Sequence, residues 1–409
     1  MLAALRSDDV RSQNRRRVLA VIRRNGVASR TDIGNSTGLS AATVSAITSD
    51  FLAEGILLPP ESKSVPSSGR GRPKVSLMVN PDAAIVCAVY FQLNRLSAVM
   101  VDYSGATISE FSTEFASRKI TSNEIRQALI HCIEKALRLA SRSASKLRRI
   151  AVGFQGVTDV EGSMVLWTPI CRQRDIRLCQ WLEDHFGVPA RVANDCDMIA
   201  QALNLREPEK YGRNFGVVLL AHGVGMGLYL REGIINGTRS SGVEFGHMTY
   251  IPGGALCRCG NRGCIEAYAG DYGISRRAKG QPEDTPPPDL LESPNLKSTM
   301  ELVQAGDENA LAAVNEAGAA IGTGLANLFA LVDPFPIVLV GQGAIFFEQM
   351  EASIRERLGT APGDFDEKRI KIDCYPHENP LVQEGCAISA LLAHDEELSS
   401  RRIQTEAAE

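Results

Sequence analysis

The segment Cys257–Cys264 (CRCGNRGC) constrains the fold of this chain more than any other part of its sequence. It contains three cysteines, and a histidine precedes the first of them by ten residues. Three thiolates and one imidazole form a complete tetrahedral ligand set for zinc, and the glycines allow the backbone to turn tightly around an ion. Because no position is left for water, the segment predicts one structural Zn²⁺ per chain; the alternative is a loop with three reduced thiols. The predicted ligands are His247, Cys257, Cys259 and Cys264.

The composition is that of an ordinary soluble protein. Apolar residues make up 44% of the 409 residues and charged residues 22%, which suits two or three globular domains. The sequence has no apolar run of about 18 residues that would suggest a membrane span. The N-terminal segment is polar and rich in arginine, unlike a signal peptide. We therefore expect a cytoplasmic protein that does not bind membranes.

Charge is distributed unevenly along the chain. Residues 1–80 contain 12 lysines and arginines against 6 aspartates and glutamates, whereas the whole chain has a net charge of −4. The N-terminal part is therefore basic and the remainder strongly acidic. A basic head on an acidic body indicates that the head binds a polyanion, although a solvated charged face is the alternative.

Three helical patterns occupy this basic head. Ser29 and Ser40 are suited to cap the second and third helices, and Gly38 ends the second. Two short helices joined by a turn that contains glycine are typical of a helix-turn-helix. The expected helices cover residues 13–25, 29–38 and 40–55.

A wing follows the three helices. Residues 56–58 and 74–79 are expected to form its two strands, with a segment rich in proline, serine and glycine between them. We therefore predict a winged helix-turn-helix domain over residues 1–79. Its partner would be double-stranded operator DNA.

The third helix is the expected recognition helix, and its N-terminal residues would face the major groove. These residues are small and include no arginine or asparagine, so direct base readout is expected to be modest. In the wing, Arg70-Gly-Arg72-Pro is suited to a narrow A·T-rich minor groove; a solvated linker is the alternative. The candidate DNA contacts are Ser40, Ala42, Thr43, Ser45, Arg70 and Arg72.

From residue 84 onward, strands and helices alternate, which predicts α/β layers with helices packed on sheets. Two further patterns stand near the cysteines: Glu244-Phe-Gly-His247 before them, and Glu266 directly after them. An Asn194-Asp195 pair follows a predicted strand. Alone, this pair is as well explained by an ordinary turn.

Together with the helix-turn-helix, these motifs resemble the signature of the ROK family (repressors, open reading frames and sugar kinases). The resemblance covers nearly the whole chain. It implies an actin-like, ribonuclease-H-like sugar-kinase fold of two α/β lobes after the winged helix-turn-helix. It also implies that a pyranose sugar is bound by Asn194, Asp195, Glu244, His247 and Glu266.

The resemblance suggests the following division of the chain. The first lobe spans residues 80–195 and is completed by a C-terminal helix near residues 380–396. The second lobe, residues 196–379, carries the zinc motif and the sugar site. A disordered tail is expected over residues 397–409.

One turn departs from the family's kinases. These carry an Asp-x-Gly-Gly-Thr turn whose amides approach the phosphates of ATP, whereas the matching stretch here is Tyr90-Phe-Gln-Leu-Asn94. The carboxylate and both glycines are missing, and with them the positioning and electrostatics that phosphoryl transfer requires. Kinase activity is therefore not expected.

The sequence predicts a sugar-responsive DNA-binding transcriptional repressor of carbohydrate metabolism genes, with a sugar or sugar phosphate as effector and no enzymatic activity. Such a repressor would act as a homodimer or homotetramer. One alternative is an active ATP-dependent ROK sugar kinase with an accessory DNA-binding head. Another is regulation through a protein partner, with the sugar pocket vestigial. The sequence specifies neither the sugar nor the operator.

Overall fold

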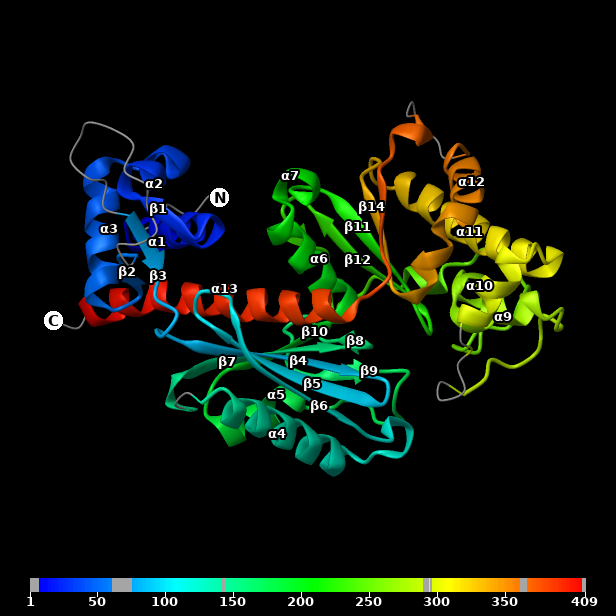
Figure 1. Ribbon diagram of the computed structural model, residues 1–409, viewed down its shortest axis with the longest axis horizontal. Helices are drawn as coiled ribbons and strands as arrows, with labels where there is room; N and C mark the ends of the chain where they lie inside the picture. Colours follow the sequence, from blue (N-terminus) through cyan, green and yellow to red (C-terminus); the bar gives the residue numbers. More distant parts are fainter. Residues whose placement is uncertain are drawn as a thin grey trace.

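The computed structural model describes residues 7–60, 76–141, 144–289, 294, 296–360 and 366–406. A small head and two α/β lobes are arranged along one long C-terminal helix, which ends beside the head (Figure 1). The head is at the left of Figure 1, the first lobe lies below the long helix and the second lobe is at the right.

The head is a winged helix-turn-helix, as predicted. The Ser29 side chain and the Asp32 side chain cap the second helix reciprocally, Gly38 ends it with φ 70°, and Ser40 caps the third. The three strands pair in the order β1-β3-β2. Its elements are α1 (Ser7–Asn25), β1 (Val27–Ser29), α2 (Arg30–Thr37), α3 (Ala41–Ala53), β2 (Leu57–Leu58) and β3 (Ser76–Val79).

Two details of the head differ from the expectation. Helix α1 begins at Ser7 instead of residue 13, and strand β1 was not expected. A strand of three residues is too short to show a pattern of alternating hydrophobicity. Its place is determined by antiparallel pairing with β3, which is a contact distant in the sequence.

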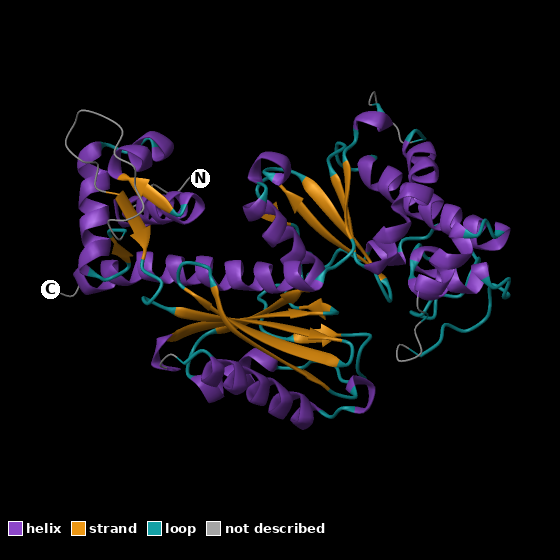
Figure 2. Ribbon diagram, viewed as in Figure 1, coloured by secondary structure: helices purple, strands orange, loops and turns teal. Residues whose placement is uncertain are grey.

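The first lobe is a five-stranded sheet in the order β10-β7-β4-β5-β6. Helices α4 and α5 cover one face, and the C-terminal helix α13 packs against β4 and β7 on the other. Figure 2 shows this layering. Its elements are β4 (Ile85–Gln92), β5 (Arg95–Asp102), β6 (Thr107–Glu114), α4 (Ser122–Leu139), β7 (Leu147–Phe154), β8 (Val157–Thr158), β9 (Val165–Trp167), α5 (Leu178–Phe186) and β10 (Ala190–Asn194).

The second lobe repeats this topology, with strands in the order β13-β12-β11-β14-β15. In both lobes three antiparallel strands are followed by two strands that run parallel to the first. Helix α6 covers one face, and α11 and α12 cover the other. Its elements are α6 (Asp195–Arg206), α7 (Pro208–Tyr211), β11 (Phe215–Leu220), β12 (Val224–Leu230), β13 (Gly233–Ile234), α8 (Glu266–Ala269), α9 (Asp271–Ala278), α10 (Leu296–Gln304), α11 (Glu308–Phe329), β14 (Ile337–Val340), α12 (Phe347–Leu358) and β15 (Ile372–Tyr375).

The C-terminal helix α13 spans Asn379–Glu406 and does not stop near residue 396. A disordered tail was expected over residues 397–409; helix α13 runs through residues 397–406, and residues 407–409 lie outside the described part. Helix α13 contacts α1 of the head through Asp395 and Glu396, which bond to Arg23 and Arg16. Buried apolar residues of the head, of α13 and of both lobes form one continuous core.

Candidate ligand-binding cleft and metal cluster

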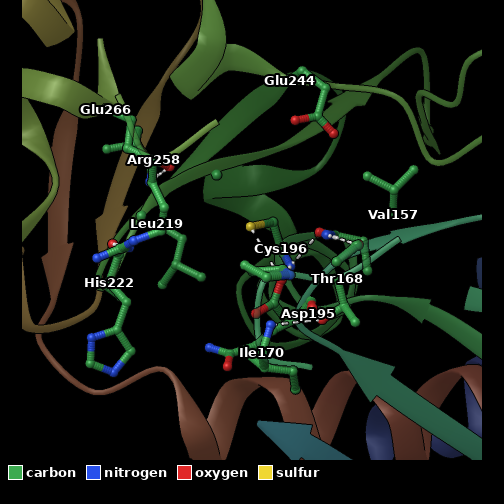
Figure 3. Close-up of a pocket in the computed structure, with 18 of the residues that line it drawn as sticks. Val157, Thr168, Ile170, Asp195, Cys196, Leu219, His222, Glu244, Arg258 and Glu266 are labelled. Carbon is green, nitrogen blue, oxygen red and sulfur yellow. Dashed lines mark hydrogen bonds between the residues drawn. The ribbon is translucent and has the colours of Figure 1, made fainter. Parts of the chain in front are cut away.

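A cavity of about 540 Å³ lies between the two lobes. The β10–α6 junction, the β11–β12 loop and the cysteine loop contribute to its wall, and Figure 3 shows acidic side chains on several sides of it. The structure brings the five residues predicted to bind sugar together around this one cavity: Asn194, Asp195, Glu244, His247 and Glu266.

Asp195 begins helix α6, where β10 ends at the edge of the first sheet. Its side chain is only 4% exposed. The Cys196 amide donates to Oδ1 at 3.0 Å and the Tyr90 hydroxyl donates to Oδ2 at 3.4 Å. Burial raises the pKa of Asp195 to about 7. Such a carboxyl accepts a hydrogen bond from a ligand hydroxyl most strongly when it is ionised.

Asn194 caps helix α6 and holds the junction in place. Its amide nitrogen donates to the Gly156 carbonyl at 2.8 Å, and its side-chain oxygen accepts from the Cys196 amide at 2.8 Å. Asn194 and Asp195 therefore form the ordinary turn that asparagine and aspartate favour after a strand. The same turn places Asp195 in the cavity wall.

The four predicted metal ligands form one cluster. One donor atom from each lies within 4.8 Å of all the others. The Cys259 and Cys264 sulfurs are 3.8 Å apart, and the Cys257 sulfur lies 3.8 Å from His247 Nδ1. Zinc–sulfur bonds of about 2.3 Å in a tetrahedral site place two sulfurs about 3.8 Å apart. The chemistry and the spacing of this donor set therefore fit Zn²⁺.

The cysteine loop depends on glycine at one position in particular. Gly263 has φ 80°, and a Cβ there would collide with the Ile251 carbonyl oxygen. A side chain at this position would therefore push apart the backbone that brings Cys264 to the cluster.

His247 and Glu266 connect the cluster with the cavity. While Nδ1 of His247 faces Cys257, Nε2 lies 3.7 Å from Glu244 Oε2. Glu266 is 7% exposed, accepts from the Tyr272 hydroxyl at 3.2 Å and lies 3.6 Å from the Cys257 sulfur. A metal bound by the cluster would orient both cavity residues.

Several cavity residues were missed by the sequence reasoning. Asp197 lies in the first turn of α6 and is buried in the wall, where burial and the neighbouring Asp195 raise its pKa well above the usual value. Arg118 and Asp289 come from different lobes and form an ion pair of 2.9 Å at the cavity. Pro287 and Pro288 of the loop before Asp289 also line the cavity. No local motif marks Arg118 and Asp289, because they belong to distant segments that meet only in the folded chain.

The turn within Tyr90–Asn94, which the sequence predicted to stand where kinases carry a phosphate loop, is closed by the chain's own side chains. Strands β4 and β5 are joined by Leu93 and Asn94. The Leu93 amide donates to Gln155 Oε1 at 2.9 Å, and the Asn94 amide donates to Ser117 Oγ at 3.3 Å. Tyr90 is fully buried with its hydroxyl on Asp195. These two amides are therefore not available to a phosphate.

The candidate DNA contacts of the head are partly described. Ser40, Ala42 and Ser45 are exposed at the start of α3. Thr43 is half-buried, and its hydroxyl is hydrogen-bonded to that of Ser40 at 2.8 Å. Arg70 and Arg72 lie outside the described residues.

Comparison with known proteins identifies the family. Residues 11–57 match a winged helix-turn-helix DNA-binding family, and residues 101–371, about two thirds of the chain, match the ROK family. The chain belongs to the ROK family. Its sugar-kinase-like lobes and N-terminal winged helix-turn-helix are those expected from the sequence.

Three relatives show how far the similarity of this ROK protein extends. The xylose repressor of Caldicellulosiruptor bescii is 25% identical over 399 residues, which cover 94% of this chain and 97% of that protein. The crystal structure of a ROK family transcriptional regulator, a homologue of the E. coli MLC protein, superimposes with a TM-score of 0.79 at 21% identity over 96% of this chain and 99% of its own. A ROK hexokinase from Thermus thermophilus covers 76% of this chain and 99% of its own, with a TM-score of 0.61 and 23% identity. Among the described helices of this chain, none is both long and apolar enough to span a bilayer.

Proposed function

We propose that this ROK protein is a sugar-responsive DNA-binding transcriptional repressor of carbohydrate metabolism genes. The observation that carries the proposal is a winged helix-turn-helix attached to a sugar-kinase fold whose phosphate turn is closed by Gln155 and Ser117. Relatives that share its full length are named as repressors, among them a xylose repressor. The similar hexokinase matches only 76% of this chain.

The sugar is proposed to bind between the lobes. Asp195, Glu244 and Glu266 supply carboxylate acceptors for its hydroxyls, and such charge-assisted hydrogen bonds are stronger than neutral ones. His247 offers Nε2 on the cavity side. Helix α13 contacts the head as well as both lobes. Closure of the lobes on the sugar would therefore change the position of the head.

We also propose one structural zinc ion per chain, bound by His247, Cys257, Cys259 and Cys264. The ion would cross-link the cysteine loop to His247 and would have no catalytic role, because its four protein ligands fill a tetrahedral site. By holding the cysteine loop it would keep His247 and Glu266 in the cavity wall.

The head, residues 1–79, is proposed to bind operator DNA through Ser40, Ala42, Thr43 and Ser45 at the start of α3. Arg70 and Arg72 of the wing are proposed to enter the adjacent minor groove. Two heads on one operator require a homodimer or homotetramer, and we place the protein in the cytoplasm. A regulatory protein partner remains the alternative effector.

Sugar phosphorylation is expected to be absent. With ATP, magnesium and a panel of hexoses, we expect no turnover, because the amides of Leu93 and Asn94 are already bonded within the chain. Coupled measurement of ADP release tests this directly. Turnover above about 1 s⁻¹, an ordinary enzymatic rate, would show that the kinase alternative is correct.

The effector site is tested by Asp195→Ala. We expect this variant to lose the sugar response while binding DNA in the absence of sugar within about twofold of wild type, since Asp195 lies in the body and not in the head. To change DNA binding from nearly full to nearly empty, the sugar must favour one state by about 5.5 kcal/mol. Gel-shift titrations with and without the sugar that most stabilises wild type measure both quantities. Asp184→Ala, on the exposed face of α5, is the matched control.

The DNA side is tested in the same titrations with Arg70→Ala and Arg72→Ala combined. Loss of two phosphate contacts would reduce the slope of log K against log salt by about 2 per head. If the arginines recognise minor-groove shape, the loss of DNA affinity is larger on A·T-rich operators than on random DNA.

The same titrations decide both tests. A response to sugar that survives in Asp195→Ala would exclude the proposed sugar site. Unchanged DNA affinity of the double variant at every salt concentration would restrict recognition to α3.

A further inference from the structure

Carboxylates outnumber cationic side chains in the cavity wall. Five carboxylates face two guanidinium groups, a formal charge of −3. Even with the buried Asp195 and Asp197 both protonated, the wall would carry a formal charge of −1. The carboxylates are Asp195, Asp197, Glu244, Glu266 and Asp289, and the cations are Arg118 and Arg258.

Arg118 is engaged by the protein itself. Its Nη1 donates to the Pro169 carbonyl at 3.0 Å and its Nη2 donates to Asp289 at 2.9 Å. The charge of this guanidinium is thus balanced by a carboxylate of the opposite lobe. An anionic ligand would have to compete with Asp289 for it.

Arg258 is engaged in a different way. Its Nη1 donates to the His222 carbonyl, and the guanidinium lies 4.5 Å above the ring of Tyr272. Its Nε and Nη2 atoms are buried within the protein and have no hydrogen-bond partner among the described residues. The imidazole of His222 is in turn bonded to the buried Asp271 at 2.8 Å, so it adds no unbalanced positive charge.

Backbone amides near the cavity are also occupied. The Leu93 amide donates to Gln155, the Cys196 amide to Asn194, and the Val224 amide to Glu266. Amides at turns and helix N-termini are the usual neutral donors for a phosphate. Here each of these three already has an acceptor within the chain.

We propose that the effector is an uncharged sugar and that the cavity rejects phosphorylated sugars and sugar acids. The inference rests on the proposed function and specifies the ligand class of the same site. An anion would meet a wall with more carboxylates than guanidinium groups, and Arg118 and Arg258 already bond to Asp289 and to the His222 carbonyl, which makes binding unfavourable. Zinc in the neighbouring cluster would not reverse this sign, because three thiolates outweigh the two charges of the ion.

The test is a matched set of sugars titrated into the full-length protein. Glucose, mannose, galactose and N-acetylglucosamine are each compared with the corresponding 6-phosphate, with xylose and glucuronate added, by thermal shift and calorimetry. We expect at least one uncharged sugar to bind, and its phosphorylated or acidic form to bind at least about tenfold more weakly. Glucuronate separates the effect of charge from that of phosphate size.

A variant links the discrimination to the carboxylates. Glu244→Gln removes one negative charge from the most exposed of the sugar-facing carboxylates. We expect it to reduce the ratio of the affinity for the uncharged sugar to the affinity for its 6-phosphate at least about threefold. Glu356→Gln, on the exposed face of α12, is the matched control and should leave the ratio unchanged. Tighter binding of a 6-phosphate or of glucuronate would overturn this inference and leave the proposed function standing. Absence of binding by every sugar in the set would overturn both.

Discussion

Cys259→Ser is expected to remove the zinc and to lower the free energy of unfolding by at least about 3 kcal/mol, because a structural zinc site contributes its binding energy to folding. The sugar response should be lost as well, since the cysteine loop holds His247 and Glu266 against the cavity. Cys259 is exposed, so exchange of sulfur for oxygen costs no core packing. The effect therefore isolates the role of Cys259 as a metal ligand.

Elemental analysis of protein purified without added metal, together with urea denaturation, measures this effect. Wild type should contain one zinc per chain. Cys374→Ser is the matched control: Cys374 is a half-buried thiol on β15, outside the cluster, and its replacement should leave the zinc content unchanged. An equally stable and responsive Cys259→Ser protein would rule out a structural zinc.

Asp395→Ala is expected to release the head from the body. Asp395 of α13 accepts two hydrogen bonds of 3.1 Å from Arg23 of α1 and one of 2.6 Å from the Tyr103 hydroxyl. Arg23 and Asp395 are only 8% and 6% exposed. Removal of one partner from a buried ion pair leaves an uncompensated charge, which costs about 3–5 kcal/mol. This pair lies where the head meets the helix that also packs on both lobes.

The consequence for function follows from that position. We expect Asp395→Ala to bind operator DNA, but with a sugar-induced change in affinity at least about tenfold smaller than in wild type, since a loosely attached head no longer follows the lobes. Gel-shift titrations measure the coupling and calorimetry measures the stability. Glu396→Ala is the matched control: this adjacent residue forms an exposed ion pair with Arg16, and such pairs contribute about 0–1 kcal/mol. A full sugar response in Asp395→Ala would show that this contact does not carry the coupling.

Much of the architecture could be predicted from local signals. The caps at Ser29 and Ser40 depend on hydrogen bonds between near neighbours, so they identify helices α2 and α3 without reference to the rest of the fold. The cysteine motif is likewise local, because three of its ligands lie within Cys257–Cys264. The loss of glycine and aspartate from Tyr90–Asn94 is visible as a change of residue type. What the turn does instead, binding Gln155 and Ser117, is visible only in the structure.

The sequence by itself determined the winged head and the α/β body, and the spacing of its cysteines predicted the metal ligand set, whereas the residues expected to bind sugar came from the resemblance to the ROK family. Only the tertiary structure decided the charge of the cavity and the path of α13. Arg118 and Asp289 are far apart in the sequence and meet because the lobes close on each other. Helix α13 meets α1 of the head at Asp395 and Glu396, two residues whose partners Arg23 and Arg16 stand near the start of the chain. Contacts between distant segments leave no periodic pattern in either segment, so they are decided by packing alone.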